Sequence, residues 1–197
     1  MKKDESRVPD RLFEGYPRLT MIDSLYFEYC EFREGKSHLV HPEDDPSQRF
    51  VLGMRLPLWQ RPFVWTDAQC RLFIESAWYG LHLGTYVFTS KFDRNAYGTE
   101  EGKNCGMIID GQQRFSALQR YFDDEIPVSG LKWSDLTEVE QRTFLHRPFH
   151  GIEIMVFDDG KLREVYDRLN FSGTPHADDQ RASVRKTATK KPLPSGM

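Results

Sequence analysis

The sequence predicts a mixed α/β (α+β) fold in a single domain, and three observations lead to this expectation. Its 197 residues, 39% hydrophobic and 29% charged, have the size and composition of one globular domain. Short runs with β-branched and aromatic content occur at 83–89, 106–109 and 152–156. Between these runs, apolar residues recur at three- and four-residue steps, as they do along one face of a helix. This alternation favours a domain that contains both strands and helices.

The N-terminal quarter of the chain is expected to be the least regular part. Residues 1–18 mix charge, proline and glycine without a convincing period, and we expect them to form a loosely packed arm. Order is expected to begin near Leu19, with a short helix over 22–29. A polar, proline-punctuated loop follows at 35–49, and the apolar stretch 50–58 predicts one extended strand.

A capped helix and a strand are predicted in the middle of the chain. Thr66 or Asp67 can cap a helix with one apolar face, and Gly80 marks the end of that helix. The strand at 83–89 then leads into a long polar connection at 90–104. Connections of this length are usually functional or mobile.

The C-terminal half continues the same alternation. Thr137 and Glu140 have the spacing of a capping box at the start of a helix. The strand at 152–156 is followed by a predicted turn at 158–160 and a last helix over 162–169.

The charge of the chain is unevenly distributed. The net charge is −3, but residues 1–180 carry 22 basic and 30 acidic residues, a net of −8. Residues 181–197 carry five basic residues and no acidic one, and we expect this tail to be disordered. The domain is therefore expected to span 19–180. An acidic body is a poor sequence-independent DNA clamp, because such binding depends on Lys and Arg that neutralise phosphates.

Two further classes of protein are not indicated by the composition. No stretch approaches the roughly 20 apolar residues that a membrane span requires, and the N-terminus has no apolar segment behind its charges. Cys30, Cys70 and Cys105 lie far apart, so neither a disulfide framework nor a zinc site is predicted. We expect an intracellular, cytoplasmic protein that does not contact membranes.

The segment most informative about function is Asp110-Gly111-Gln112-Gln113-Arg114, between a buried strand and a helix. A helix start offers unpaired N–H groups and a positive dipole end, which favour a phosphate group. Gly111 allows close approach, Arg114 can bind phosphate in bidentate fashion, and Asp110 could hold a magnesium ion. The alternative is that Asp110 only caps the helix and the following polar side chains are solvated.

A second polar pair, Gln60-Arg61, lies between Pro57 and Pro62 and is followed by Phe-Val-Trp. Aromatic side chains beside an arginine suit a nucleobase or another planar group. The alternative is that the aromatic residues belong to the core and Arg61 is an ordinary surface charge.

Four segments taken together resemble a known family. They are Leu56–Trp65 (LPLWQRPFVW), His82–Gly84 (HLG), Ile108–Arg114 (IIDGQQR) and Arg168–Pro175 (RLNFSGTP). In this order and spacing they are similar to the N-terminal domain of GmrSD-type restriction endonucleases, which belongs to the ParB/sulfiredoxin-like superfamily. The resemblance covers about residues 50–180.

The resemblance implies a ParB-like α/β fold, a mixed sheet flanked by helices, in which the Asp-Gly-Gln-Gln-Arg turn is a phosphate-binding motif. In the defence members of the family this motif is needed for nucleoside triphosphate hydrolysis. Carried over to this chain, the implied phosphate and magnesium site comprises Asp110, Gly111, Gln112, Gln113 and Arg114. Gln60 and Arg61 would lie beside this site, and Asn170 and Gly173 would shape a neighbouring loop.

Two departures from the family pattern bear on function. The defence proteins usually join this domain to a nuclease domain with a His-Asn-His motif, whereas this sequence ends shortly after the Asn-x-x-Gly segment. DNA cleavage is therefore not expected. Sulfiredoxins carry a catalytic cysteine in Gly-Cys-His-Arg, where this chain has Gly111-Gln112-Gln113-Arg114, so their sulfur chemistry lacks its nucleophile.

The leading hypothesis is a domain that binds and hydrolyses a nucleoside triphosphate with Mg²⁺, in a phage or anti-phage defence setting. In this hypothesis Asp110 places the metal or water, Arg114 holds phosphate oxygens, and Gln112 or Gln113 orients the attacking water. A competing hypothesis is a non-catalytic regulator that keeps the fold and binds DNA or a phage or defence protein. A ParB-like nuclease is the third. The sequence leaves the base and the oligomeric state open.

Overall fold

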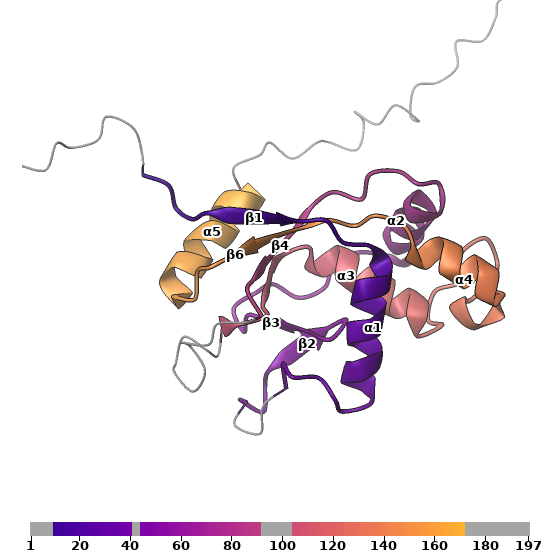
Figure 1. Cartoon of the computed structure of the whole chain (residues 1–197), viewed down its shortest axis with the longest axis horizontal. Coiled ribbons are helices and arrows are strands. Elements are labelled where there is room, and N and C mark those ends of the chain that lie inside the picture. Colours follow the sequence, from indigo (N-terminus) through magenta and orange to yellow (C-terminus); the bar gives the residue numbers. More distant parts are fainter. Residues whose placement is uncertain (1–9, 41–43, 92–103, 172–197) are drawn as a thin grey trace, which may run out of the picture.

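A four-stranded mixed sheet lies at the centre of the fold in the computed structural model, which describes residues 10–40, 44–91 and 104–171 (Figure 1). Its strands, in spatial order, are β1 (Gly15–Arg18), β6 (Gly151–Ile154), β4 (Tyr86–Thr89) and β5 (Ile108–Asp110). The central pair β6 and β4 is parallel, while the two edge strands β1 and β5 run antiparallel to their neighbours. The predicted mixed sheet is confirmed.

Helices and one hairpin complete the described structure. The helices are α1 (Ile22–Arg33), α2 (Asp67–Trp78), α3 (Gln112–Phe122), α4 (Glu138–Leu145), α5 (Asp159–Phe171) and the short 3-10 helix η2 (Trp133–Asp135). The hairpin consists of β2 (Arg49–Val51) and β3 (Met54–Leu56). The predicted flanking of the sheet by helices is therefore also confirmed.

The two faces of the sheet carry separate apolar clusters. Tyr86 and Phe88 of β4 belong to the larger cluster, together with core residues from α1, α2, α3 and α4. Val87, which alternates with them, belongs to a smaller cluster with Ile109 and the apolar side of α5. Figure 1 accordingly shows α5 apart from the other four helices. The helices thus form two layers around the sheet, and β5 is in contact with both.

Two helix starts follow directly from local sequence. Thr66 caps α2 through a capping box, in which its hydroxyl accepts from the Gln69 N–H at 3.3 Å and its own N–H donates to Gln69 Oε1 at 2.8 Å. Thr137 and Glu140 form the same arrangement at α4. Both predicted caps are confirmed.

Strand β1 lies inside the segment that the sequence assigned to a loose arm. It pairs with β6 from Gly15 opposite Ile154 to Arg18 opposite Gly151, and Arg18 forms an ion pair with Glu153. The expectation that order begins near Leu19 is therefore wrong by one strand. The strand has no apolar alternation because all four of its residues are exposed at the sheet edge. Residues 1–9 of the predicted arm lie outside the described part of the chain.

The apolar stretch 50–58 is a hairpin rather than one strand. Leu52 and Gly53 have φ values of +49° and +81°, so the chain reverses between β2 and β3 in a two-residue turn. The turn could not be predicted from polarity, because Leu52 and Met54 are hydrophobic and almost fully buried, like strand residues. The prediction of a single extended strand is therefore wrong.

The last described helix is longer than the sequence predicts. It begins at Asp159, where a turn was expected, because Asp158 caps it by accepting from the Lys161 N–H at 2.8 Å. It also includes Asn170, which the resemblance placed in a loop. Gly173 and the basic tail 181–197 lie outside the described residues.

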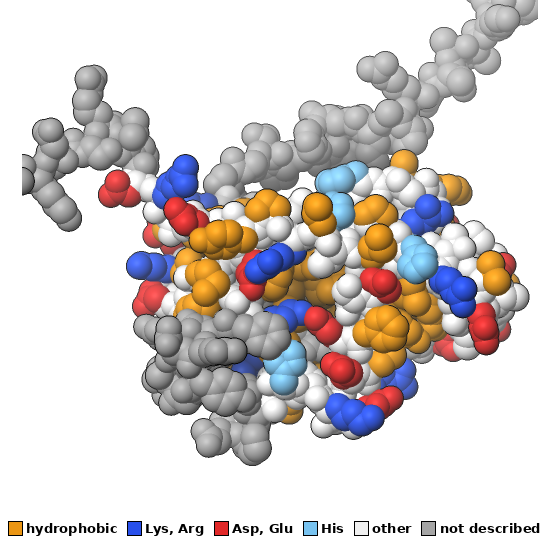
Figure 2. Space-filling model, in the orientation of Figure 1, with side chains coloured by type: hydrophobic (Ala, Val, Ile, Leu, Met, Phe, Trp, Pro, Cys, Tyr) orange, Lys and Arg blue, Asp and Glu red, His pale blue; other side chains and the backbone are white. Residues whose placement is uncertain are grey.

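The described surface shows mixed charge. On the face seen in Figure 2, Lys and Arg side chains are interspersed with Asp and Glu side chains rather than gathered in a continuous basic stripe. Among the described residues, no helix has both the length and the apolar character that crossing a membrane requires.

Candidate functional site

A cavity of about 170 Å³ opens at the N-terminus of α3 and brings the predicted site residues together. Its lining residues come from the loop after β3, the turn between β5 and α3, and the C-terminal half of α5. They are Gln60, Arg61, Trp65, Asp110, Gly111, Gln112, Gln113, Arg114, Tyr166 and Asn170. Three segments that lie far apart in the sequence thus meet at one place.

Gly111 determines how closely the turn approaches the sheet. Its φ is +117°, in the left-handed region, and a Cβ at this position would lie 2.8 Å from Cβ of Tyr86. Only glycine satisfies both conditions. Because glycine has no capping side chain, no such cap satisfies the N–H groups that open α3, and the Phe115 N–H makes the first helical bond to Gly111 O at 3.0 Å. The helix start keeps donors for an anion.

Both polar atoms of the Gln113 side-chain amide bond to the loop that carries the Gln60-Arg61 pair. Its Oε1 accepts from the N–H groups of Val64 at 2.9 Å and Trp65 at 3.1 Å. Its Nε2 donates to Pro62 O at 3.4 Å. Gln113 is 8% exposed, so its own end of these bonds is shielded from water. This side chain therefore fixes the loop against the helix start.

Arg114 fixes a second neighbouring segment. Its Nη1 donates to Leu83 O at 3.3 Å, and its Nη2 donates to Thr85 O at 3.1 Å and to Asp110 Oδ2 at 2.8 Å. A guanidinium has five N–H donors, so these bonds leave one on Nη1 and the one on Nε. Arg114 thus holds Leu83 and Thr85 against the turn, and two of its N–H donors make no hydrogen bond among the described residues.

Arg61 contrasts with Arg114. It is exposed at the cavity, and within the described residues its guanidinium makes no hydrogen bond or ion pair. No described residue therefore occupies its donors. For a phosphate group, Arg61 is therefore the better-placed of the two cations.

Gln60 is held at three points and leaves one polar atom unpaired. Its N–H donates to Pro57 O at 3.0 Å, its carbonyl oxygen accepts from Arg49 Nη2 at 2.6 Å, and its Nε2 donates to Ile109 O at 3.3 Å. The side-chain Oε1 is buried and has no hydrogen-bond partner among the described residues.

Asp110 is the carboxylate of the cavity. Its Oδ2 accepts from Arg114, its Oδ1 makes no hydrogen bond within the described residues, and its side chain is 35% exposed. No group of three or more His, Cys, Asp or Glu residues in the described ranges could hold a metal ion. Mg²⁺ commonly binds through one or two carboxylates plus substrate phosphates and water, and a single Asp110 fits that pattern.

Two aromatic residues and Asn170 form the remaining wall. Asn170 Nδ2 donates to Tyr166 O at 2.9 Å, and the Trp59 ring packs edge-on against Tyr166 with ring centroids 5.2 Å apart. Trp65, which the sequence marked only as an aromatic neighbour of Arg61, lies in the same wall. Tyr166 was missed, although its spacing of four residues from Asn170 puts both on one side of a helix.

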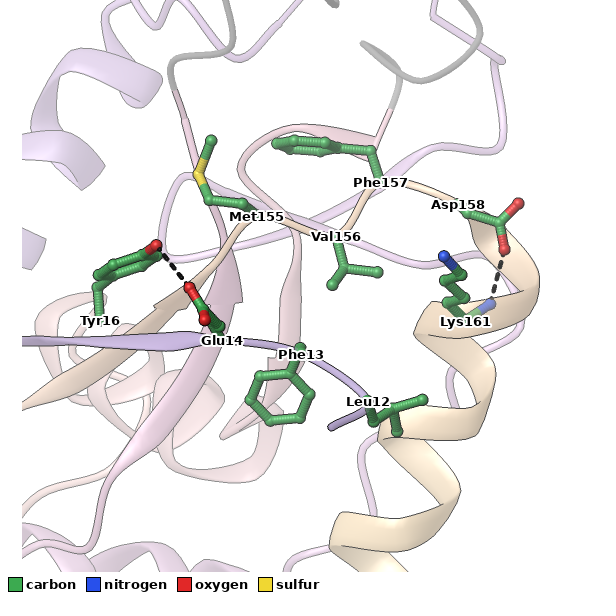
Figure 3. Close-up of a pocket in the computed structure, with 9 residues that line it drawn as sticks. All are labelled: Leu12, Phe13, Glu14, Tyr16, Met155, Val156, Phe157, Asp158 and Lys161. Carbon is green, nitrogen blue, oxygen red and sulfur yellow. Dashed lines mark hydrogen bonds between the residues drawn. The ribbon is translucent and has the colours of Figure 1, made fainter. Parts of the chain in front are cut away.

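A second, larger cavity of about 470 Å³ lies elsewhere, between the residues before β1, those after β6 and the start of α5 (Figure 3). It is bordered mainly by apolar side chains, among them Phe13, Met155 and Phe157. Its Tyr16 hydroxyl donates to Glu14 at 3.2 Å. None of the predicted site residues lines it, so size alone does not identify the site.

The comparison with known protein families agrees with the geometry of the smaller cavity. Residues 44–181 match the family described as GmrSD restriction endonuclease, N-terminal domain. No curated protein and no solved structure matched the chain. The family match covers more than half of the chain and includes every residue that lines the cavity at the start of α3. The chain therefore belongs to the family of GmrSD restriction endonuclease N-terminal domains.

Proposed function

We propose that this chain binds the phosphate end of a nucleoside triphosphate together with Mg²⁺ at the cavity beside Gly111, and hydrolyses it. The observation that carries the proposal is the combination, in one cavity, of a helix start without a side-chain cap and the guanidinium of Arg61, which has no partner among the described residues. Backbone N–H groups, a helix dipole and a free arginine are complementary to a polyanion.

The size of the cavity supports recognition of the phosphate end. A volume of about 170 Å³ is smaller than the roughly 300–1,000 Å³ of pockets that enclose a drug-sized ligand. A terminal phosphate with its metal fits this space better than a whole nucleotide does. In this proposal the base and sugar extend toward the rim, where Arg61 and the ring of Trp65 lie.

Asp110 would hold the magnesium ion, whose charge would neutralise phosphate oxygens. The protein's own contribution is orientation and charge stabilisation. The amides at the start of α3 and Arg61 donate to phosphate oxygens, Arg114 keeps Asp110 in position, and Gln112 lines the cavity with an amide that is unbonded within the described residues. The family membership supports a role of this proposed activity in restriction and defence against phage.

The test measures phosphate release from the four common nucleoside triphosphates with Mg²⁺. We expect turnover by the wild type and a loss of at least about tenfold in kcat/KM for Arg61→Ala, the effect of one charge-assisted hydrogen bond. Arg142→Ala is the matched control, because Arg142 is an exposed arginine on α4 that does not line the cavity. Arg61 is preferred to Arg114 because Arg114 also holds the fold.

Release at background level together with no nucleotide binding in wild type would overturn the proposal. Tight binding without turnover would instead favour the competing function, a regulator that keeps the fold and senses the nucleotide. Metal-dependent nicking of plasmid DNA that is lost in Asp110→Ala would favour a nuclease.

A further inference from the structure

The unpaired side-chain oxygen of Gln60 is the feature of the cavity that the proposed function does not yet use. Gln60 is 5% exposed and lines the cavity, and its Oε1 is buried without a hydrogen-bond partner among the described residues. Leaving a buried acceptor unsatisfied costs about 1–3 kcal/mol. Such an atom in a native site indicates a ligand or water that completes it.

The orientation of this amide is fixed by its surroundings. The bond from Nε2 to Ile109 O determines which edge of the amide carries the oxygen, because only the NH₂ group can donate to a carbonyl. The backbone of Gln60 is held by Pro57 and by Arg49, whose Nη2 also donates to Pro57 O at 3.0 Å. The Oε1 atom is therefore a preorganised acceptor rather than one that rotates freely.

Chemistry limits what this acceptor can bind. A phosphate oxygen is itself an acceptor, so Oε1 cannot bind the phosphate directly. Its partner is either a metal ion or a group that donates a hydrogen bond, and hydrolysis of a phosphoanhydride requires one such donor next to the terminal phosphorus, namely the attacking water. Gln113 cannot serve this purpose because both atoms of its amide are engaged with residues 62–65.

On the basis of the proposed function, we infer that Gln60 Oε1 accepts a hydrogen bond from the attacking water and orients it. The water oxygen forms a bond to the terminal phosphorus while the bond from that phosphorus to the bridging oxygen breaks. The bonding electrons remain on the diphosphate, and the proton that water gives up passes to an oxygen of the released phosphate. An amide is too weak a base to take this proton, so Gln60 acts by orientation alone.

The test compares Gln60→Leu with wild type in two measurements. One is steady-state phosphate release, and the other is the thermal shift produced by Mg²⁺ with a non-hydrolysable triphosphate analogue. We expect kcat to fall at least tenfold while KM and the analogue-induced shift change less than twofold. Retained analogue binding also shows that the variant is folded. Gln141→Leu is the matched control, because Gln141 is an α4 glutamine whose Nε2 donates to Trp133 O at 3.0 Å.

Three outcomes would overturn the inference while the proposed function stands. Wild-type kcat in Gln60→Leu would show that the oxygen does not act on the water. A loss of analogue binding with an unchanged melting temperature would place Gln60 on the nucleotide instead. An increased Mg²⁺ requirement for turnover would make the oxygen a metal ligand. If Gln60→Leu does not fold, Gln60→Asn, which withdraws the amide by one methylene, is expected to show the same selective loss of kcat.

Discussion

At the scale of single residues, the turn between β5 and α3 contains one residue that fits because it has no side chain and two residues that hold the turn in place by hydrogen bonds. Gly111 allows the turn to lie against Tyr86, and Gln113 and Arg114 each tie it to another segment. Arg61 and Gln60 Oε1 are left unpaired within the described structure. The groups that hold the site and the groups that can meet a ligand are thus different side chains.

We expect Gly111→Ala to destabilise the protein by more than the cost of backbone strain alone. A left-handed conformation costs a non-glycine residue about 1–3 kcal/mol, and the new Cβ would also approach Tyr86 Cβ at 2.8 Å. Gly130→Ala is the control, because Gly130 has a φ of +82° and nothing within 4 Å of an added Cβ. Urea denaturation measures the free energies of unfolding, and equal losses in the two variants would contradict the packing argument.

Replacement of Gln113 is expected to loosen the loop at 62–65. Gln113→Leu keeps the approximate shape but leaves the N–H groups of Val64 and Trp65 without their acceptor, at about 1–3 kcal/mol for each group that stays buried. Gln141→Leu, which removes a single donor on α4, is expected to cost less. Denaturant unfolding of both variants provides the measurement. A smaller loss of unfolding free energy for Gln113→Leu than for Gln141→Leu would refute the conclusion that Gln113 holds the loop against the helix start.

At the scale of elements, the cavity depends on contacts between α5 and the loop after β3. Trp59 Nε1 donates to Asp159 Oδ1 at 2.7 Å, at the first turn of α5, and the Trp59 ring packs on Tyr166. Burial acts to raise the pKa of Asp159, but hydrogen bonds from Arg163 and Trp59 outweigh it and lower the pKa below the ordinary value. The carboxylate form is therefore the one that the folded state prefers.

This preference predicts a pH dependence with a defined sign. A lowered pKa contributes stability above the ordinary value near pH 4, and this contribution is lost as the pH falls through the folded-state pKa. We expect Asp159→Asn to reduce the free energy of unfolding at pH 7 by less than about 1 kcal/mol, because the side chain is about half exposed. The difference from wild type should shrink below pH 4. A difference that is unchanged between pH 7 and pH 3 would contradict this account.

At the scale of the whole molecule, binding of a nucleotide should increase the free energy of unfolding of the protein. A ligand that binds only the native state at one hundred times its Kd adds about 2.7 kcal/mol. We expect the melting temperature of the wild type to rise with the concentration of Mg²⁺ and triphosphate. Arg61→Ala should need a higher concentration for the same rise, while Arg142→Ala should follow the wild type. Identical curves for all three proteins would argue against Arg61 as a phosphate contact.

The sequence allowed prediction of the parts that depend on local chemistry. The capping boxes at Thr66 and Thr137 and the glycine turn before α3 follow from neighbouring residues, and the family resemblance brought Gln60 and Asn170 to the same site. Strand β1 could not be predicted, because all four of its residues are exposed and it forms by pairing with β6, which lies far away in the sequence. The structural role of Arg114 could not be predicted either, since two of its acceptors are backbone carbonyls about 30 residues away in the sequence.

The amide of Gln113 has a consequence for protein engineering. Because it bonds to two backbone N–H groups and one carbonyl of residues 62–65, the turn between β5 and α3 is not an independent module. Transplanting 110–114 alone into another scaffold would leave this amide without partners and Arg61 behind. A graft that preserves the site must carry at least 57–65, 83–86 and 110–114 together.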